Sequence, residues 1–189
     1  MPRQLYYFDR PQRFVAGTVG LPGERTFFLQ ATDRTRVVSV SLEKQQVQVL
    51  AERLEEMLLQ LSQRSGVPMP PAAATDTESL SQPIDEEFRV AALGLAWDAE
   101  SGQVLIEAQA AAEDAETAEA TLLEDVEEGP DALRVRIPPD VALAFAERAR
   151  RILAAGRPQC PLCTLPLDPQ GHVCPRQNGY RRGATYGAA

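Results

Sequence analysis

The stretch RVVSVSLEKQQVQVLAERLEEMLLQL, residues 36–61, decides the fold, because a β-branched run passes directly into apolar residues at helical spacing. Arg36–Val40 has the composition of a strand. Ser41 suits a helix N-cap, and Gly66 suits the position just past a helix end. Between them, apolar residues recur at steps of three and four, which predicts one buried helical stripe. This stripe consists of Val47, Leu50, Leu54, Met57, Leu58 and Leu61.

Three segments upstream of this stretch are also rich in aromatic and β-branched residues: Leu5–Phe8, Arg13–Val19 and Thr26–Leu29. Proline, glycine and aspartate residues, which favour turns, separate these segments from one another. Together with Arg36–Val40, they predict a four-stranded antiparallel meander. The helical stripe should lie on this meander.

The second part of the chain repeats this order of elements. Phe88–Trp97 and Val104–Ala110 alternate as strands around a turn at residues 100–102. Ala132–Ile137 alternates again, and a second helix is predicted over Pro139–Ala155. The sequence therefore predicts an α+β fold with two antiparallel β-meander-plus-helix halves, which share one sheet or pack face to face, followed by a small C-terminal zinc-binding unit.

Two segments lack apolar periodicity. Residues 66–83 are rich in proline, alanine, serine and threonine, which predicts a linker or a long mobile loop. Residues 111–129 consist mostly of alanine, acidic residues and threonine, which predicts an exposed or disordered acidic loop. We therefore divide the chain into an α+β body at 1–156, a zinc-binding unit at 157–182 and a disordered tail at 183–189.

Metal-binding residue types cluster near the C-terminus. Cys160 and Cys163 form a Cys-x-x-Cys pair, and His172 and Cys174 follow after eight residues. These are the three cysteines and the one histidine of the chain, and three cysteines cannot all pair as disulfides. Four such ligands can close a tetrahedron around zinc. We predict one structural Zn²⁺ held by these four residues.

Other chemistries of this cluster fit the sequence less well. Iron would accept the same ligands, but the histidine in the set favours zinc. Free thiols remain an alternative, and a redox Cys-x-x-Cys would need the strand-to-helix context of a thioredoxin. Zinc deaminases need His-x-Glu, whereas this chain has His172-Val173-Cys174. We predict no catalytic and no cofactor-binding residues.

The charge is unevenly distributed along the chain. The formal net charge is −8, yet four arginines against one aspartate give +3 after residue 156 and leave −11 before it. An acidic body would repel phosphates, so only the tail, through Arg157, Arg176, Arg181 and Arg182, could approach nucleic acid. The sequence has no apolar run typical of a membrane span or a signal peptide, so we expect a cytoplasmic protein.

Five motifs are distinctive: TFFLQA at 26–31, LEKQQV at 42–47, GRP at 156–158, CPLC at 160–163 and DPQGHVCPRQNGY at 168–180. They resemble those of an uncharacterised family found in actinobacteria and their relatives. The resemblance covers nearly the whole chain, and it implies a domain of unknown function in a cytoplasmic setting. It also implies genes that often neighbour a mycothiol-synthesis ligase and a phosphomutase-like protein, with no established activity.

One position departs from the pattern of that family. Glycine is expected directly after the second cysteine, where zinc knuckles often need a positive φ, but this chain has Thr164. A left-handed conformation costs a residue with a Cβ atom about 1 kcal/mol or more. We therefore expect the first turn of the zinc-binding unit to bend differently.

Three functions remain open from the sequence. The first is a nonenzymatic interaction protein with a structural zinc and a protein partner, because no nucleotide-binding loop or catalytic pair is evident. The second is an enzyme, or a subunit of one, that acts on a small metabolite through a pocket of arginine and carboxylate groups. The third, less favoured, is nucleic-acid binding through the basic zinc-binding tail.

Overall fold

The computed structural model describes residues 2–21, 23–34, 36–66, 68–156, 160–165, 167, 172 and 174–176. This part of the chain contains eight strands and three helices. In chain order they are β1 (Leu5–Asp9), β2 (Arg13–Val19), β3 (Thr26–Asp33), β4 (Arg36–Leu42), α1 (Lys44–Ser65), β5 (Glu86–Arg89), β6 (Ala92–Asp98), β7 (Gln103–Gln109), α2 (Ala115–Thr121), β8 (Ala132–Ile137) and α3 (Pro139–Ala154).

The strands form two four-stranded sheets, ordered β2-β3-β4-β5 and β1-β8-β7-β6. Each sheet contains an antiparallel meander of three strands, and a fourth strand joins it in parallel. In one sheet β5 pairs with β4, where Ser39 lies opposite Glu86. In the other, β1 pairs with β8, where Leu5 lies opposite Ala132. The predicted α+β class with two meander-plus-helix halves is confirmed.

The two halves exchange their first strands. The first half, β1 to α1, sends β1 to the sheet of the second half, and the second half, β5 to α3, sends β5 to the sheet of the first. The prediction that Leu5–Phe8 belongs to the first meander is therefore wrong, as is a single strand over Phe88–Trp97. Aromatic and β-branched residues favour strands in general, but they do not specify which strand pairs with β1, whose partner begins at residue 132.

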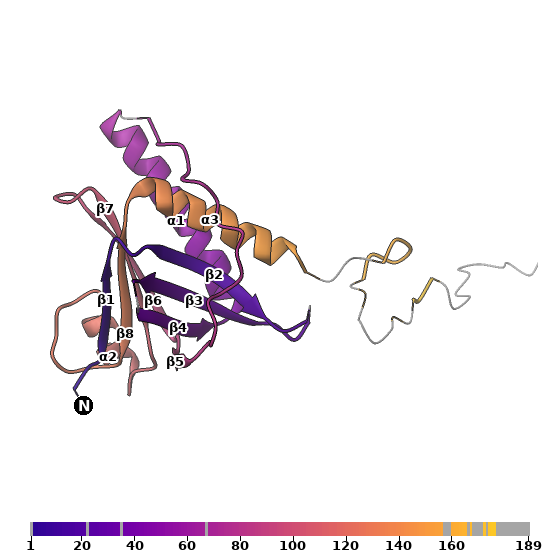
Figure 1. Cartoon of the computed structure of the whole chain (residues 1–189), viewed down its shortest axis with the longest axis horizontal. Coiled ribbons are helices and arrows are strands. Elements are labelled where there is room, and N and C mark those ends of the chain that lie inside the picture. Colours follow the sequence, from indigo (N-terminus) through magenta and orange to yellow (C-terminus); the bar gives the residue numbers. More distant parts are fainter. Residues whose placement is uncertain are drawn as a thin grey trace, which may run out of the picture.

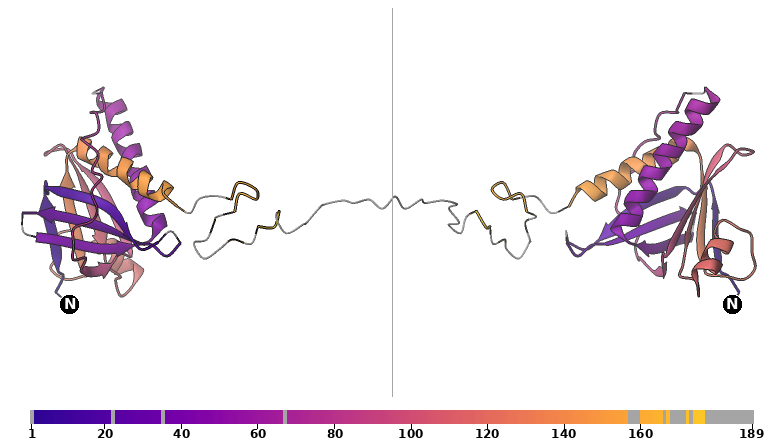
Figure 2. Two further views of the ribbon diagram at one scale, coloured as in Figure 1. Left: turned by 45° about the vertical axis from the view of Figure 1, so that its right-hand side comes forward. Right: turned by 180° about the vertical axis from the view of Figure 1, so that it is seen from behind.

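Helices α1 and α3 pack against each other on one side of the sheets, as the view from behind in Figure 2 shows. The predicted stripe of α1 is buried at Val47, Leu50, Leu54 and Leu58. On α3, the ring of Phe145 stacks on that of Phe14 in β2, with 4.8 Å between ring centroids. Residues of both sheets and both helices form one apolar core.

At the ends of α1, the structure corrects the predicted N-cap and confirms the predicted C-terminal glycine. The N-cap is Glu43, whose backbone N–H donates to the side chain of Gln46 at 2.8 Å in a capping box. The predicted N-cap Ser41 lies instead in β4, and its hydroxyl donates to Glu86 at 2.7 Å. Gly66 is the C-cap with φ 69°, as predicted.

Residues 68–83, which we call the strap, run from the end of α1 past α3 and β2 towards β5 (Figure 1). The strap contains no helix or strand, as its composition predicts, but it is anchored to the body. The Ala73 N–H donates to the Asp140 carbonyl at 2.9 Å. Leu80 is buried over Gly17 of β2, where an added Cβ would overlap the leucine side chain. The strap is thus a fixed part of the body rather than the mobile loop expected.

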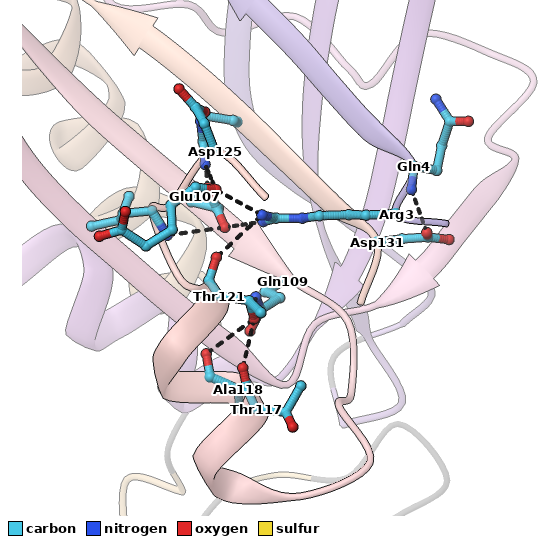
Figure 3. Close-up of polar contacts among 12 residues, drawn as sticks. Arg3, Gln4, Glu107, Gln109, Thr117, Ala118, Thr121, Asp125 and Asp131 are labelled. Carbon is cyan, nitrogen blue, oxygen red and sulfur yellow. Dashed lines mark hydrogen bonds and ion pairs between the residues drawn. The ribbon is translucent and has the colours of Figure 1, made fainter. Parts of the chain in front are cut away.

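The acidic segment 111–129 is also anchored (Figure 3). It contains α2, whose N-cap Asp114 accepts a hydrogen bond from the Thr117 N–H at 2.7 Å. At the end of α2, the hydroxyl of Thr121 is buried and accepts a hydrogen bond from Gln109 of β7 at 2.8 Å. The expectation of an exposed or disordered acidic loop fails at Thr121, because its buried partner Gln109 lies on a distant strand.

Candidate metal centre

A tight turn holds the first two predicted ligands, Cys160 and Cys163. The Thr164 N–H donates to the Cys160 carbonyl, and the Cys160 N–H donates to the Leu165 carbonyl, both at 2.8 Å. Thr164 has φ 62°. Our expectation that this turn bends differently is therefore wrong, because the threonine adopts the left-handed conformation that glycine takes more easily.

The side chains of all four predicted ligands lie close together. The candidate ligand atoms of Cys160, Cys163, His172 and Cys174 lie within 4.8 Å of one another. The Sγ atoms of Cys160 and Cys174 are 3.8 Å apart, and Cys163 Sγ lies 3.1 Å from His172 Nε2. A tetrahedral ion with metal–sulfur bonds of about 2.3 Å would hold two sulfurs about 3.8 Å apart. The donor set and its spacing therefore fit a tetrahedral metal ion.

The thiols differ in their electrostatic surroundings. The pKa of Cys160 is lowered to about 6, mainly because the backbone N–H groups of Cys163 and Leu162 point at its sulfur. The pKa of Cys163 is raised, first by burial and also by the neighbouring thiols. Three thiolates this close would repel one another, so a cation at the centre would favour the deprotonated ligands.

The turn is supported from within its own segment. Arg176 donates to the Leu162 carbonyl at 2.7 Å. Every hydrogen bond that the structure gives for the described residues between 160 and 176 has both partners in this segment. Leu162 and Leu165 expose about half of their surface. Of the other predicted tail residues, Arg157, Arg181, Arg182 and the tail 183–189 lie outside the described residues.

Sequence reasoning missed a cluster of arginines around Asp76 in the strap. Arg148 of α3 is buried, and its Nη1 donates to Asp76 Oδ1 at 2.7 Å. Arg13 of β2 donates to the same carboxylate from Nε at 2.5 Å and from Nη2 at 3.0 Å. This guanidinium lowers the pKa of Asp76. An arginine within the apolar stripe of a helix was the one available signal, since Arg148 follows Phe145 by three positions.

A second missed cluster surrounds Glu107 of β7 (Figure 3). The Glu107 carboxylate is fully buried and accepts hydrogen bonds from Arg3 and from Arg134, the latter at 2.6 Å. Arg134 also pairs with Asp125 of the acidic segment. Two arginines and two carboxylates balance one another here. We assign this cluster a structural role, because it ties the N-terminus and the acidic segment to the sheet.

The chain matches a known protein family. No curated protein and no solved structure matches it. Within the described residues, no helix combines the length and the apolar character needed to span a membrane. A family model described as "Protein of unknown function (DUF3090)" matches residues 6–174, which include both halves of the body and all four candidate ligands. The chain therefore belongs to the DUF3090 family.

Proposed function

We propose that this protein is a nonenzymatic cytoplasmic interaction protein with a structural zinc site. The observation that carries the proposal is the convergence of the ligand atoms of Cys160, Cys163, His172 and Cys174 within 4.8 Å. Three thiols and one imidazole form a donor set that is typical of structural zinc. Iron–sulfur sites are usually held by cysteines alone, so His172 favours zinc.

The donor set supports a structural role for this zinc over a catalytic one. Hydrolytic zinc keeps one position open for water and has a carboxylate base nearby. Here four protein donors are available, and the cluster found among the described residues contains no aspartate or glutamate. Residues 157–182 include few apolar residues, so we expect metal binding to supply much of the stability of this unit.

The exposed surface of the zinc-binding unit supports a protein partner. Leu162 lies within the turn that holds two ligands and Leu165 follows that turn, and they are 47% and 50% exposed. Metal coordination would fix both leucines in place, which lowers the entropic cost of binding. Nucleic acid is a weaker candidate, because Arg176 is engaged with the Leu162 carbonyl and the body is acidic.

Metal analysis of the full chain tests the zinc site. We expect close to one zinc per chain after purification without chelators, and loss of this zinc in the Cys174→Ser variant. Leu162→Ser is the matched control, since it adds a serine to the same unit without removing a ligand. A wild-type content well below half an equivalent, or equal zinc in Cys174→Ser, would contradict the proposal.

Hydrogen exchange on the same variants tests whether the zinc-binding unit is separable. Cys174→Ser should lose protection after residue 159 and keep it over Arg13–Leu61, because the core of the body is built from other residues. Partner binding is tested by pull-down with the wild type and with the Leu162→Ser/Leu165→Ser variant. A partner that the wild type alone retains, at equal zinc content, supports the interaction role.

A further inference from the structure

The arginine cluster around Asp76 holds the strap and also concentrates positive charge. Arg13, Arg148 and Arg151 all donate to Asp76, to its carboxylate or to its carbonyl. Nearby, Arg25 donates to the carbonyls of Ile152 and Ala155 at the C-terminal end of α3. Three guanidinium groups, those of Arg13, Arg148 and Arg151, therefore gather around Asp76 in a body whose formal charge is −11.

Carboxylates at this place do not balance the arginines. Asp76 accepts hydrogen bonds from Arg13 and Arg148, and Glu78 lies close enough to Arg13 to interact with its charge. Three arginines thus share the two carboxylates of Asp76 and Glu78. The pKa of Arg148 is lowered, first by burial; the charge of Asp76 opposes this shift, and the charges of Arg13 and Arg151 add to it.

Arg148 and Arg151 differ in how many of their N–H groups donate hydrogen bonds within the protein. Arg148 is 6% exposed and gives its N–H groups to the strap and to β2: to the Ala16 carbonyl at 2.7 Å, to Asp76, and to the Glu78 carbonyl at 2.7 Å. It is therefore a fixed charge. Arg151 is exposed and, among the contacts of the described residues, donates one hydrogen bond, to the Asp76 carbonyl at 3.0 Å. Arg151 has five N–H groups, so most remain available.

A cavity of about 240 Å³ lies between the strap and the last turns of α3. Arg148 and Arg151 line it, together with Thr77, Ile152 and Ala155 and the already paired Asp76. We propose that this cavity binds one small oxyanion, with a phosphate or carboxylate group. Arg151 and the Thr77 hydroxyl would donate to the anion, and Arg148 would supply a fixed charge behind it.

Two features would otherwise repel an anion here, and both are neutralised. The carboxylate oxygens of Asp76 each accept a hydrogen bond from an arginine. The C-terminal end of a helix carries a partial negative charge, but Arg25 donates to the carbonyls of Ile152 and Ala155 at that end of α3. The inference is independent of the zinc site, because every residue in it belongs to the body.

Titration of the full chain with inorganic phosphate and, separately, with succinate at constant ionic strength tests the site. We expect saturable shifts of the amide signals of Thr77 and Ile152 with at least one of the two probes. Arg151→Gln should weaken binding about tenfold, as expected when a hydrogen bond to a charged group is lost. Saturation by one probe alone identifies the class of anion, and saturation by both identifies a general oxyanion site.

Arg150→Gln is the matched control, because Arg150 is the neighbouring arginine on α3 and pairs with Glu55 of α1. It removes the same charge and should leave binding unchanged. Thr77→Val provides a second variant in case Arg151→Gln disturbs the strap, and it should also weaken binding. Equal weakening by Arg150→Gln and Arg151→Gln, or no saturable shift with either probe up to about 10 mM, would overturn the inference.

Discussion

Thr164 is the residue at which the candidate metal centre stores backbone strain. It has φ 62° directly after the ligand Cys163, in the region where a Cβ atom is unfavourable. Thr164→Gly should therefore stabilise the metal-bound turn by about 1 kcal/mol, which is about fivefold in zinc affinity. Competition with a chromophoric zinc chelator measures this difference.

The greater chain entropy of glycine in the metal-free state opposes this gain. Thr164→Ala separates the two effects, because alanine removes the threonine side chain but keeps the Cβ atom and the strain. Weaker zinc binding by Thr164→Gly than by Thr164→Ala would show that the left-handed conformation is not what limits the affinity.

The four candidate ligands could be predicted from the sequence because they lie within fifteen positions, and short spacings determine which side chains can meet. The partners of Arg148 could not be predicted in the same way. Asp76 lies 72 positions upstream of Arg148, on a segment without periodicity. The path of the strap over α3 and β2 brings the two residues together.

At the scale of elements, the strap is held partly by the ion pairs of Asp76 with Arg13 and Arg148. The pKa of Asp76 is lowered in the folded protein, chiefly by its hydrogen bond with Arg13. A lowered folded pKa contributes stability that is complete above the unfolded pKa of about 3.9 and is lost as the pH falls through the folded pKa. Asp76→Asn should therefore lower the free energy of unfolding at pH 7, by about 1–3 kcal/mol, and much less at pH 3.

Urea unfolding of the wild type and Asp76→Asn at the two pH values measures this difference. Glu119→Gln is the control, because Glu119 is an exposed acidic residue on α2 and its loss should change stability little at either pH. A destabilisation by Asp76→Asn that is as large at pH 3 as at pH 7 would mean that packing, rather than charge, holds the strap.

Helices and hairpins were predictable at the level of elements because their signals are local. The bounds of α3 and the left-handed Gly66 at the end of α1 follow from capping and periodicity. The anchoring of the strap and the helix α2 were not predicted, because few apolar residues mark these segments. Leu80 anchors the strap by filling the space that Gly17 leaves on β2, and such a pair has no sequence pattern.

At the scale of the whole molecule, strand exchange makes the two halves interdependent. Each sheet takes its fourth strand from the other half, and α1 packs on α3. We therefore expect that a chain cut after Gly66 gives two fragments that are largely unfolded alone, since each would lose a strand and half of the core. Mixed in equal amounts, they should form a native-like 1:1 complex.

Circular dichroism and sedimentation of the fragments, separate and mixed, test this expectation. The first fragment ends with α1, and the second begins with the strap and contains α3. A stable monomeric fold of either fragment, with the far-ultraviolet spectrum unchanged on mixing, would show that the exchanged strands contribute little to the cohesion of the body.

The position of β1 also has a consequence for synthesis of the protein on the ribosome. Leu5 leaves the exit tunnel before its partner Ala132, which is 127 residues further along the chain. At ordinary rates of translation, this interval lasts roughly 6 to 25 seconds. During that time the strand partner of Tyr6, Tyr7 and Phe8 has not yet been made, so we expect this segment to be exposed to aggregation or to chaperone binding.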